Sequence, residues 1–183
     1  MGQTIGFTTM FSRIGPLLLA STEEGLCYLG FGEEQQALPV FQRWARKMFL
    51  GAILEPDERG NQQAKTELEE YFSGNRKQFD VPIALHGTAF QKAVWQELTR
   101  IPYGETKSYK EIALALGQAK AVRAIGGANN RNPIPIIVPC HRVIGSNGAL
   151  VGYGGGLSIK EQLLALEGAG KPSSHPESVK AIR

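Results

Sequence analysis

The chain has 183 residues, of which 42% are hydrophobic, and a formal net charge of +3 at pH 7. A chain of this length can bury about 70% of the surface that it exposes when unfolded, so it needs no disulfides or metals for stability. The length predicts one or two small domains. The two cysteines lack CxxC spacing, and there is neither a secretory segment nor an apolar run of about 18 residues. These features argue against a disulfide scaffold and a membrane protein. They predict a reducing, cytoplasmic location, or a nuclear one in a eukaryote.

The first half of the chain begins with short runs that are apolar or alternate between apolar and polar residues. They span residues 8–12, 17–21 and 26–31, with turn-forming residues between them. This pattern predicts a meander of antiparallel strands.

Helical spacing follows the strands, at residues 41–49 and 62–72, and Ser73-Gly74 is a stop signal for the second helix. Residues 81–85 are predicted to form an extended connection, and His86-Gly87 a domain boundary. We therefore expect an α/β domain over residues 1–87, with a small antiparallel sheet and helices.

The second half is predicted to be mostly helical. Apolar residues recur at helical spacing from Thr88 to Leu98, a second helix is predicted over 106–117, and a third begins at about Ala121 after a short turn. Two short helices around a tight turn indicate a helix-turn-helix unit, although a plain helical hairpin is an alternative. The excess of basic residues in this half is compatible with a polyanionic partner.

The third of these helices has an unusually small surface, formed by Ala121, Ala124, Gly126, Gly127 and Ala128. Each glycine costs roughly 1 kcal/mol relative to alanine in a helix. Such a cost indicates that another backbone approaches closely. That backbone could belong to DNA or to a packed helix.

The motif Val138–Arg142 places Cys140 beside His141. A free thiol with a pKa of about 8.5 is mostly protonated at pH 7, so a nucleophilic cysteine needs a neighbouring base. Residues 134–138 are predicted to form a short buried strand that ends at Pro139, which puts the Cys-His pair on a turn. A bridging water could carry the proton between them. The alternative is that Cys140 is an inert, buried cysteine.

The surrounding segments resemble the O6-alkylguanine-DNA alkyltransferase family. The matching segments are residues 132–145, 152–157 and 160–168, with Phe90-Gln-x-x-Val-Trp95, Ile101–Gly104 and Ser108-Tyr109 upstream in the same order. The resemblance implies a ribonuclease H-like domain over 1–87 and a winged helix-turn-helix domain over 88–168 that binds DNA and accepts the alkyl group. Residues 169–183 are predicted to form a flexible tail.

The resemblance also implies roles in opening the duplex. Arg123 matches the arginine that fills the place vacated by a flipped base, on a helix that enters the minor groove with Ala124, Gly126 and Gly127. Tyr109 matches the hydroxyl that hydrogen-bonds a ring nitrogen of the flipped guanine and so stabilises the leaving purine. Without the resemblance, Arg123 would be interpreted as a solvated charge.

Further roles implied by the resemblance concern the thiol and its pocket. Asn132 matches a hinge asparagine that bonds the backbone near the active turn, and Glu167 completes a relay of Cys140, a water and His141. The residues expected to line the base pocket are Pro135, Val143, Tyr153, Gly154 and Gly155.

The implied function is DNA repair. The chain is expected to bind double-stranded DNA through the minor groove as a monomer and to move the alkyl group of O6-alkylguanine, and of O4-alkylthymine, irreversibly to Cys140. Each molecule is then used once, with no metal or organic cofactor. Some relatives carry a structural zinc, but Cys27 and His86 do not supply zinc-site spacing here. The alternatives are a lesion sensor without transfer, a cysteine hydrolase and a helix-turn-helix regulator.

Overall fold

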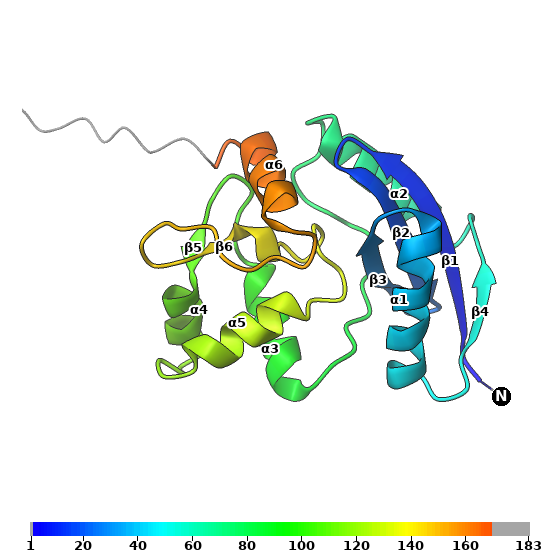
Figure 1. Cartoon of the computed structure of the whole chain (residues 1–183), viewed down its shortest axis with the longest axis horizontal. Helices are drawn as coiled ribbons and strands as arrows, with labels where there is room; N and C mark the ends of the chain where they lie inside the picture. The colour runs from blue at the N-terminus through cyan, green and yellow to red at the C-terminus, as the bar shows by residue number, and fades with distance from the viewer. Residues whose placement is uncertain (1, 170–183) are drawn as a thin grey trace, which may run out of the picture.

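The computed structural model describes residues 2–169, which form two lobes (Figure 1). The elements of the first lobe are β1 (Thr4–Ser12), β2 (Gly15–Thr22), β3 (Gly25–Phe31), α1 (Glu34–Met48), β4 (Ile53–Pro56) and α2 (Gln62–Phe72). Those of the second lobe are α3 (Ala89–Leu98), β5 (Lys107–Ser108), α4 (Tyr109–Ala115), α5 (Val122–Asn130), the 3-10 turn η1 (Cys140–Arg142), β6 (Val143–Ile144) and α6 (Leu157–Glu167). The predicted tail lies outside the described residues apart from Ala169.

The sheet of the first lobe has the strand order β3-β2-β1-β4. The predicted antiparallel meander of β1, β2 and β3 is confirmed, but β4 pairs parallel to β1, so the sheet is mixed. Sequence reasoning missed β4 because this four-residue strand is largely exposed and carries no apolar pattern. The extended connection over 81–85 is confirmed, since Leu26 N donates to Pro82 O and Leu26 O accepts from Ala84 N, each at 2.8 Å.

Strand β2 is buried on both faces, which explains its uninterrupted apolar run. Successive side chains of a strand point to opposite faces. Leu18 and Ala20 pack with Phe41 of α1, whereas Leu17 and Leu19 face α2 and the second lobe. The sheet is thus the layer to which the second lobe is attached.

Helix α1 begins seven residues before the predicted start at Phe41. The predicted start was wrong. Pro39, a residue that is unfavourable inside a helix, lies in the second turn. The helix tolerates the lost hydrogen bond because Ala37, Phe41 and Ala45 form a continuous buried face against the sheet. Helix α2 has the predicted bounds, and Ser73 is its C-cap.

Helices α3 and α4 begin at capping boxes. Thr88 and Gln91 bond each other's backbone N–H groups at the start of α3, and Ser108 and Glu111 do the same at α4. The helix predicted over 106–117 therefore starts later, at Tyr109, because Lys107 and Ser108 pair with β6.

Residues 134–138 do not form the predicted strand. The segment is buried but turns back on itself: Val138 N donates to Ile134 O at 2.9 Å, and Ile136 adopts a positive φ of 74°. Prolines at 133, 135 and 139 lack the N–H groups that a strand ladder requires. The prediction that the Cys-His pair lies on a turn is confirmed by η1.

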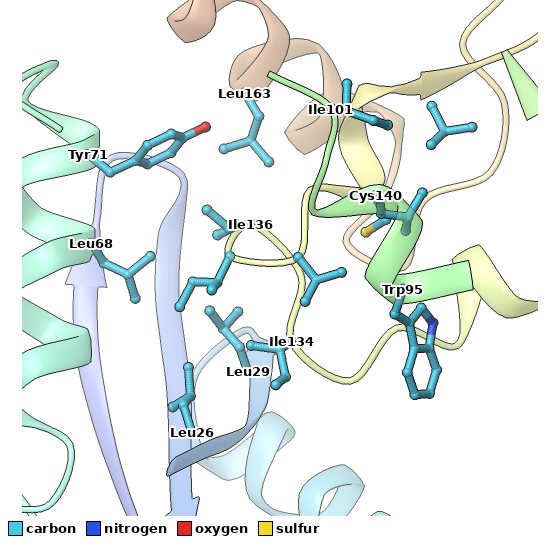
Figure 2. Close-up of a cluster of buried hydrophobic side chains, with 14 of the residues drawn as sticks. Leu26, Leu29, Leu68, Tyr71, Trp95, Ile101, Ile134, Ile136, Cys140 and Leu163 are labelled. Carbon is cyan, nitrogen blue, oxygen red and sulfur yellow. The ribbon is translucent and has the colours of Figure 1, made fainter. Parts of the chain in front are cut away.

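One hydrophobic cluster runs through both lobes (Figure 2). Leu26 and Leu29 of β3 and Leu68 of α2 face Ile134 and Ile136 of the turn before Cys140. The main chain joins the lobes as well, because Leu29 N donates to Pro133 O at 2.8 Å. The backbone that leads to the thiol is therefore held against the sheet.

Candidate active site

Cys140 lies at the first position of η1 and is 3% exposed. Its N–H donates to Val138 O at 2.8 Å, and Arg142 N donates to Pro139 O at 3.0 Å. These bonds close the turn in place of a helix or strand ladder. The sulfur is therefore fixed by backbone that is itself buried.

His141 and Glu167 form the predicted pair. His141 Nε2 lies 2.8 Å from Glu167 Oε1, and the histidine side chain is fully buried. No hydrogen bond joins the side chains of Cys140 and His141 within residues 2–169, and His141 Nδ1 has no partner among the protein groups there. A water bridging the thiol and Nδ1 is compatible with this geometry.

The carboxylate of Glu167 also binds Arg142. The guanidinium donates from Nε to Oε2 at 2.8 Å and from Nη2 to Oε1 at 2.9 Å. Burial alone would raise the pKa of Glu167, but hydrogen bonds from His141 and Arg142 outweigh it and lower the pKa to about 2. Glu167 is therefore an anion at every physiological pH.

The thiol and the imidazole are both neutral at rest. Burial raises the pKa of Cys140 to about 11, although the nearby Asn132 amide and Lys160 ammonium oppose the rise. Burial also lowers the pKa of His141, against the opposing effect of Glu167. A neutral imidazole can accept a proton, so the pair is poised for base-assisted release of the thiol proton rather than a stored thiolate.

Asn132 holds the turn that leads to Cys140. Its Nδ2 donates to Val138 O at 2.8 Å, and its Oδ1 accepts from Ile134 N at 3.0 Å. The first bond is the expected contact with backbone near the thiol, and the second is a short-range turn of the Asx type. One side chain makes both contacts.

Tyr109, the first residue of α4, is half-buried. Its hydroxyl donates to Val151 O at 3.0 Å. Burial raises the pKa of the hydroxyl, and the nearby Cys140 sulfur raises it further. The hydroxyl keeps its proton and is a donor near the thiol. In this structure its partner is the loop before α6.

The residues expected to line the base pocket differ in exposure. Pro135 and Val143 are buried, Tyr153 and Gly155 are half-buried, and Gly154 is exposed. A Cβ on Gly155 would lie only 3.0 Å from Phe31 of the first lobe and 3.1 Å from Tyr153, so any larger residue here would have to displace these rings by a few tenths of an ångström. A Cβ on Gly154 would have its nearest neighbour, a backbone oxygen, 3.9 Å away. The loop is thus closely packed at Gly155 and open at Gly154.

The predicted DNA-contact residues share the outer side of α5. Arg123 and Ala124 are exposed and Gly126 and Gly127 are half-buried, whereas Ile125 faces the core. A Cβ at Gly126 would come no closer than 3.9 Å to another side chain, and one at Gly127 no closer than 3.4 Å. Close helix packing therefore does not explain these glycines.

Lys160 is a buried site residue that sequence reasoning missed. Its side chain is inaccessible, and Nζ donates to Val143 O at 2.5 Å and to Val151 O at 3.1 Å. A signal existed, because Lys160 and Glu167 occupy the same helical stripe as the buried Leu163 and Leu164. Charged residues on the apolar stripe of a helix indicate paired, buried groups.

Cys27 and His86 do not belong to this site. Cys27 is buried in β3, where burial raises its pKa to about 12. His86 packs edge-on against Phe49, with 4.5 Å between ring centroids. No group of three or more His, Cys, Asp or Glu side chains could hold a metal ion in the part of the chain described, and no helix there is long and apolar enough to cross a membrane.

Both lobes match known families. Residues 5–85 match the family described as "6-O-methylguanine DNA methyltransferase, ribonuclease-like domain", and residues 89–169 match "6-O-methylguanine DNA methyltransferase, DNA binding domain". The fold is therefore an N-terminal ribonuclease-like α/β domain followed by a mostly helical DNA-binding domain.

Individual relatives are similar to this chain over most of its length. A methylated-DNA–protein-cysteine methyltransferase of Methanosarcina acetivorans is 52% identical over 86% of this chain and 95% of its own length. The inducible enzyme of Bacillus subtilis is 46% identical over 81% of this chain and 82% of its own. The crystal structure of Mycobacterium tuberculosis O6-methylguanine methyltransferase has a TM-score of 0.77 at 44% identity, covering 92% of this chain and 96% of that one. The chain belongs to the methylated-DNA–protein-cysteine methyltransferase family.

Proposed function

We propose that Cys140 is the residue that accepts the methyl group in this chain. As a member of its family, the protein repairs DNA by transferring methyl from O6-methylguanine to one of its own cysteines. The observation that carries the choice of cysteine is the buried relay: His141 and Glu167 adjoin Cys140. Cys27, in contrast, is buried inside a sheet, where its thiol donates to the backbone oxygen of Ala20 at 3.4 Å.

The reaction is an in-line displacement. The thiol proton passes through a water to His141, the sulfur attacks the alkyl carbon, and the carbon–oxygen bond breaks with its electron pair going to the purine. Tyr109 stabilises the leaving purine by donating a hydrogen bond from its hydroxyl to a ring nitrogen. The purine then takes a proton from solvent, and the His141 imidazolium releases its proton to solvent. The product is a thioether, which has no easy leaving step, so each molecule acts once.

The base reaches the thiol by leaving the duplex. Extrusion of a base costs a few kcal/mol in lost stacking and pairing. Arg123 occupies the vacated place from the minor groove, and the small outer side of α5 admits the DNA backbone. Support comes from the exposure of Arg123 and Ala124 and from a Mycobacterium tuberculosis relative solved in complex with DNA, 43% identical with a TM-score of 0.75.

The pocket determines which adducts react. The open position at Gly154 leaves room for alkyl groups larger than methyl. O4-alkylthymine is a further proposed substrate. The hinge role of Asn132 and a pocket formed by Pro135, Val143 and Tyr153 complete this assignment. The protein acts as a monomer in a reducing, cytoplasmic compartment, and the division into 1–87 and 88–168 is part of the same proposal.

The alternatives differ from alkyl transfer in what happens to the thiol. A lesion sensor would bind alkylated DNA and leave the protein unmodified. A cysteine hydrolase would turn over repeatedly and ignore DNA. A helix-turn-helix regulator would bind a defined sequence rather than a damaged base.

The test is intact-mass spectrometry after exposure to excess duplex that contains O6-methylguanine. We expect every molecule to gain one methyl group and peptide mapping to place it on Cys140. Cys27→Ala should react like the wild type, whereas Cys140→Ala should bind the duplex and stay unmodified. Repeated turnover, modification at Cys27 or retained transfer by Cys140→Ala would contradict the proposal.

A further inference from the structure

The relay at Cys140 includes a side chain from the opposite lobe. Tyr71 lies on α2, is fully buried, and its hydroxyl is 2.6 Å from Glu167 Oε1. Figure 2 shows Tyr71 reaching from α2 with its hydroxyl directed toward the second lobe, near Leu163 of α6. The two bonded residues are 96 positions apart in the sequence.

Tyr71 shares its acceptor atom with the histidine. Glu167 Oε1 lies 2.6 Å from the Tyr71 hydroxyl, 2.8 Å from His141 Nε2 and 2.9 Å from Arg142 Nη2. The other carboxylate oxygen, Oε2, accepts from Arg142 Nε at 2.8 Å and from Gly104 N at 3.4 Å. Loss of the Tyr71 donor would therefore change the charge on Oε1 and, with it, the strength of the hydrogen bond between Oε1 and the imidazole.

The direction of this hydrogen bond is defined by the charges. Glu167 is ionised, so it can only accept. Burial, followed by the Glu167 charge, raises the pKa of Tyr71 far above its usual range, so the phenol keeps its proton. The hydroxyl is thus a permanent donor to the carboxylate.

Donation to Oε1 reduces the negative charge that this oxygen presents to His141. An anion bonded to a histidine favours the imidazolium form and raises its pKa. The charged and titratable groups that face the His141–Glu167 pair are Cys140, Arg142, Lys160, Tyr71, Tyr103 and Tyr153. Among them Tyr71 is the neutral group that donates directly to the shared oxygen.

We propose that Tyr71 is a positioning residue of the alkyl-transfer site, through which the N-terminal lobe orients Glu167 and keeps His141 in its neutral, proton-accepting form. The inference rests on the proposed function of Cys140, His141 and Glu167. It gives the ribonuclease-like lobe a part in positioning the groups that carry out the transfer.

The test is the pH dependence of single-turnover methyl transfer with saturating O6-methylguanine duplex. In Tyr71→Phe the Glu167 carboxylate loses one hydrogen-bond donor, so His141 becomes protonated at a higher pH. The acid limb of the pH–rate profile therefore shifts to higher pH. We expect the rate at pH 6 to fall about threefold to tenfold relative to the wild type, and the rate at pH 8.5 to stay within about twofold. A purely structural role would lower the rate equally at all pH values.

Tyr103→Phe is the matched control. Tyr103 stands edge-on to Tyr71, with 6.1 Å between ring centroids, but its hydroxyl donates to Leu166 O rather than to the carboxylate. Removing this hydroxyl should leave the acid limb unchanged. An equal shift in both variants would overturn the role of Tyr71.

A second substitution should shift the acid limb in the opposite direction. It keeps the hydroxyl at position 71, so a folding defect from the loss of that hydroxyl cannot explain the result. Incorporation of 3-fluorotyrosine at position 71 makes the phenol a stronger donor, so the acid limb should move to lower pH. Absence of methyl transfer by the wild type would refute the proposed function itself. Normal transfer by the wild type, with profiles unchanged by both substitutions or lowered uniformly by Tyr71→Phe, would refute only the role of Tyr71.

Discussion

Glu167 is buried in the second lobe, and its hydrogen bonds explain why a carboxylate is tolerated there. Three side chains donate to it, from Tyr71, His141 and Arg142. A buried ion pair is favourable only when the remaining hydrogen-bonding capacity is met. The carboxylate thus serves stability and the relay at once, which makes its ionisation measurable through folding.

The ionisation of Glu167 predicts an acid-dependent loss of stability. Its pKa is lowered from about 4.5 unfolded to about 2 folded, so its contribution is complete above pH 4.5 and is lost as the pH falls toward 2. This corresponds to roughly 3 kcal/mol of the free energy of unfolding. Urea denaturation between pH 5 and 2 should therefore show a steeper decline for the wild type than for Glu167→Gln, which has no carboxylate to titrate. Parallel declines in the two proteins would contradict this assignment.

The residues around the thiol show which parts of the site can be predicted from local sequence patterns. Cys140 and His141 are adjacent in the chain, and Asn132 precedes them on the same turn, so their proximity was predictable. Lys160 left a weaker signal, a charge on an apolar helical stripe. Tyr71 left none, because a tyrosine on the buried face of an amphipathic helix is indistinguishable from a core residue.

At the scale of elements, α5 resolves an alternative that the sequence left open. Its glycines were compatible with close approach of either DNA or a packed helix. Space exists for a Cβ at Gly126, whose nearest neighbour would be Tyr109 at 3.9 Å. The fold itself therefore does not require glycine there.

Substitution of Gly126 separates folding from DNA contact. Gly126→Ala should raise the free energy of unfolding by up to about 1 kcal/mol, because alanine is the better helix former. It should also weaken binding to alkylated duplex, measured by fluorescence anisotropy, because in the proposed complex the added methyl group would lie between α5 and the DNA backbone. Transfer from free O6-benzylguanine should be unchanged. Unaltered duplex binding together with higher stability would exclude this approach.

Two elements differ from their predictions, for different physical reasons. Helix α1 begins before the predicted range of 41–49, and the apolar run over 134–138 does not form the predicted strand. Packing overrides local preference in α1, which keeps Pro39 because its buried face covers the sheet. The apolar run, in contrast, turns for a local reason, because its prolines lack the N–H groups that a strand ladder requires. For residues 134–138 burial was predicted correctly, whereas the backbone geometry was not.

At the scale of the whole molecule, the lobes share a hydrophobic core. The cluster includes Leu29 and Leu68 from the sheet lobe and Ile134, Val138 and Cys140 from the site. The boundary at His86-Gly87 remains a prediction about sequence organisation. The packing indicates that the two parts depend on each other for stability.

Thermal unfolding should therefore occur in one cooperative transition. Far-ultraviolet and near-ultraviolet circular dichroism should give coincident curves, because exposing the cluster in one lobe exposes it in the other. Leu29→Ala, which removes a contact at the junction, should lower the stability of both lobes together by about 2–5 kcal/mol. Two separated transitions in the wild type would show that each lobe folds independently.

Local patterns in this chain were sufficient for the strand meander, the bounds of α2 and the turn that carries Cys140 and His141. Each depends on residues close together in sequence, where spacing and chemistry restrict the possible structures. Strand β4, the Lys160 contacts and the Tyr71–Glu167 bond became visible only in three dimensions. Such contacts join residues far apart in the chain, and the packing of the two lobes around one core determines which of them meet.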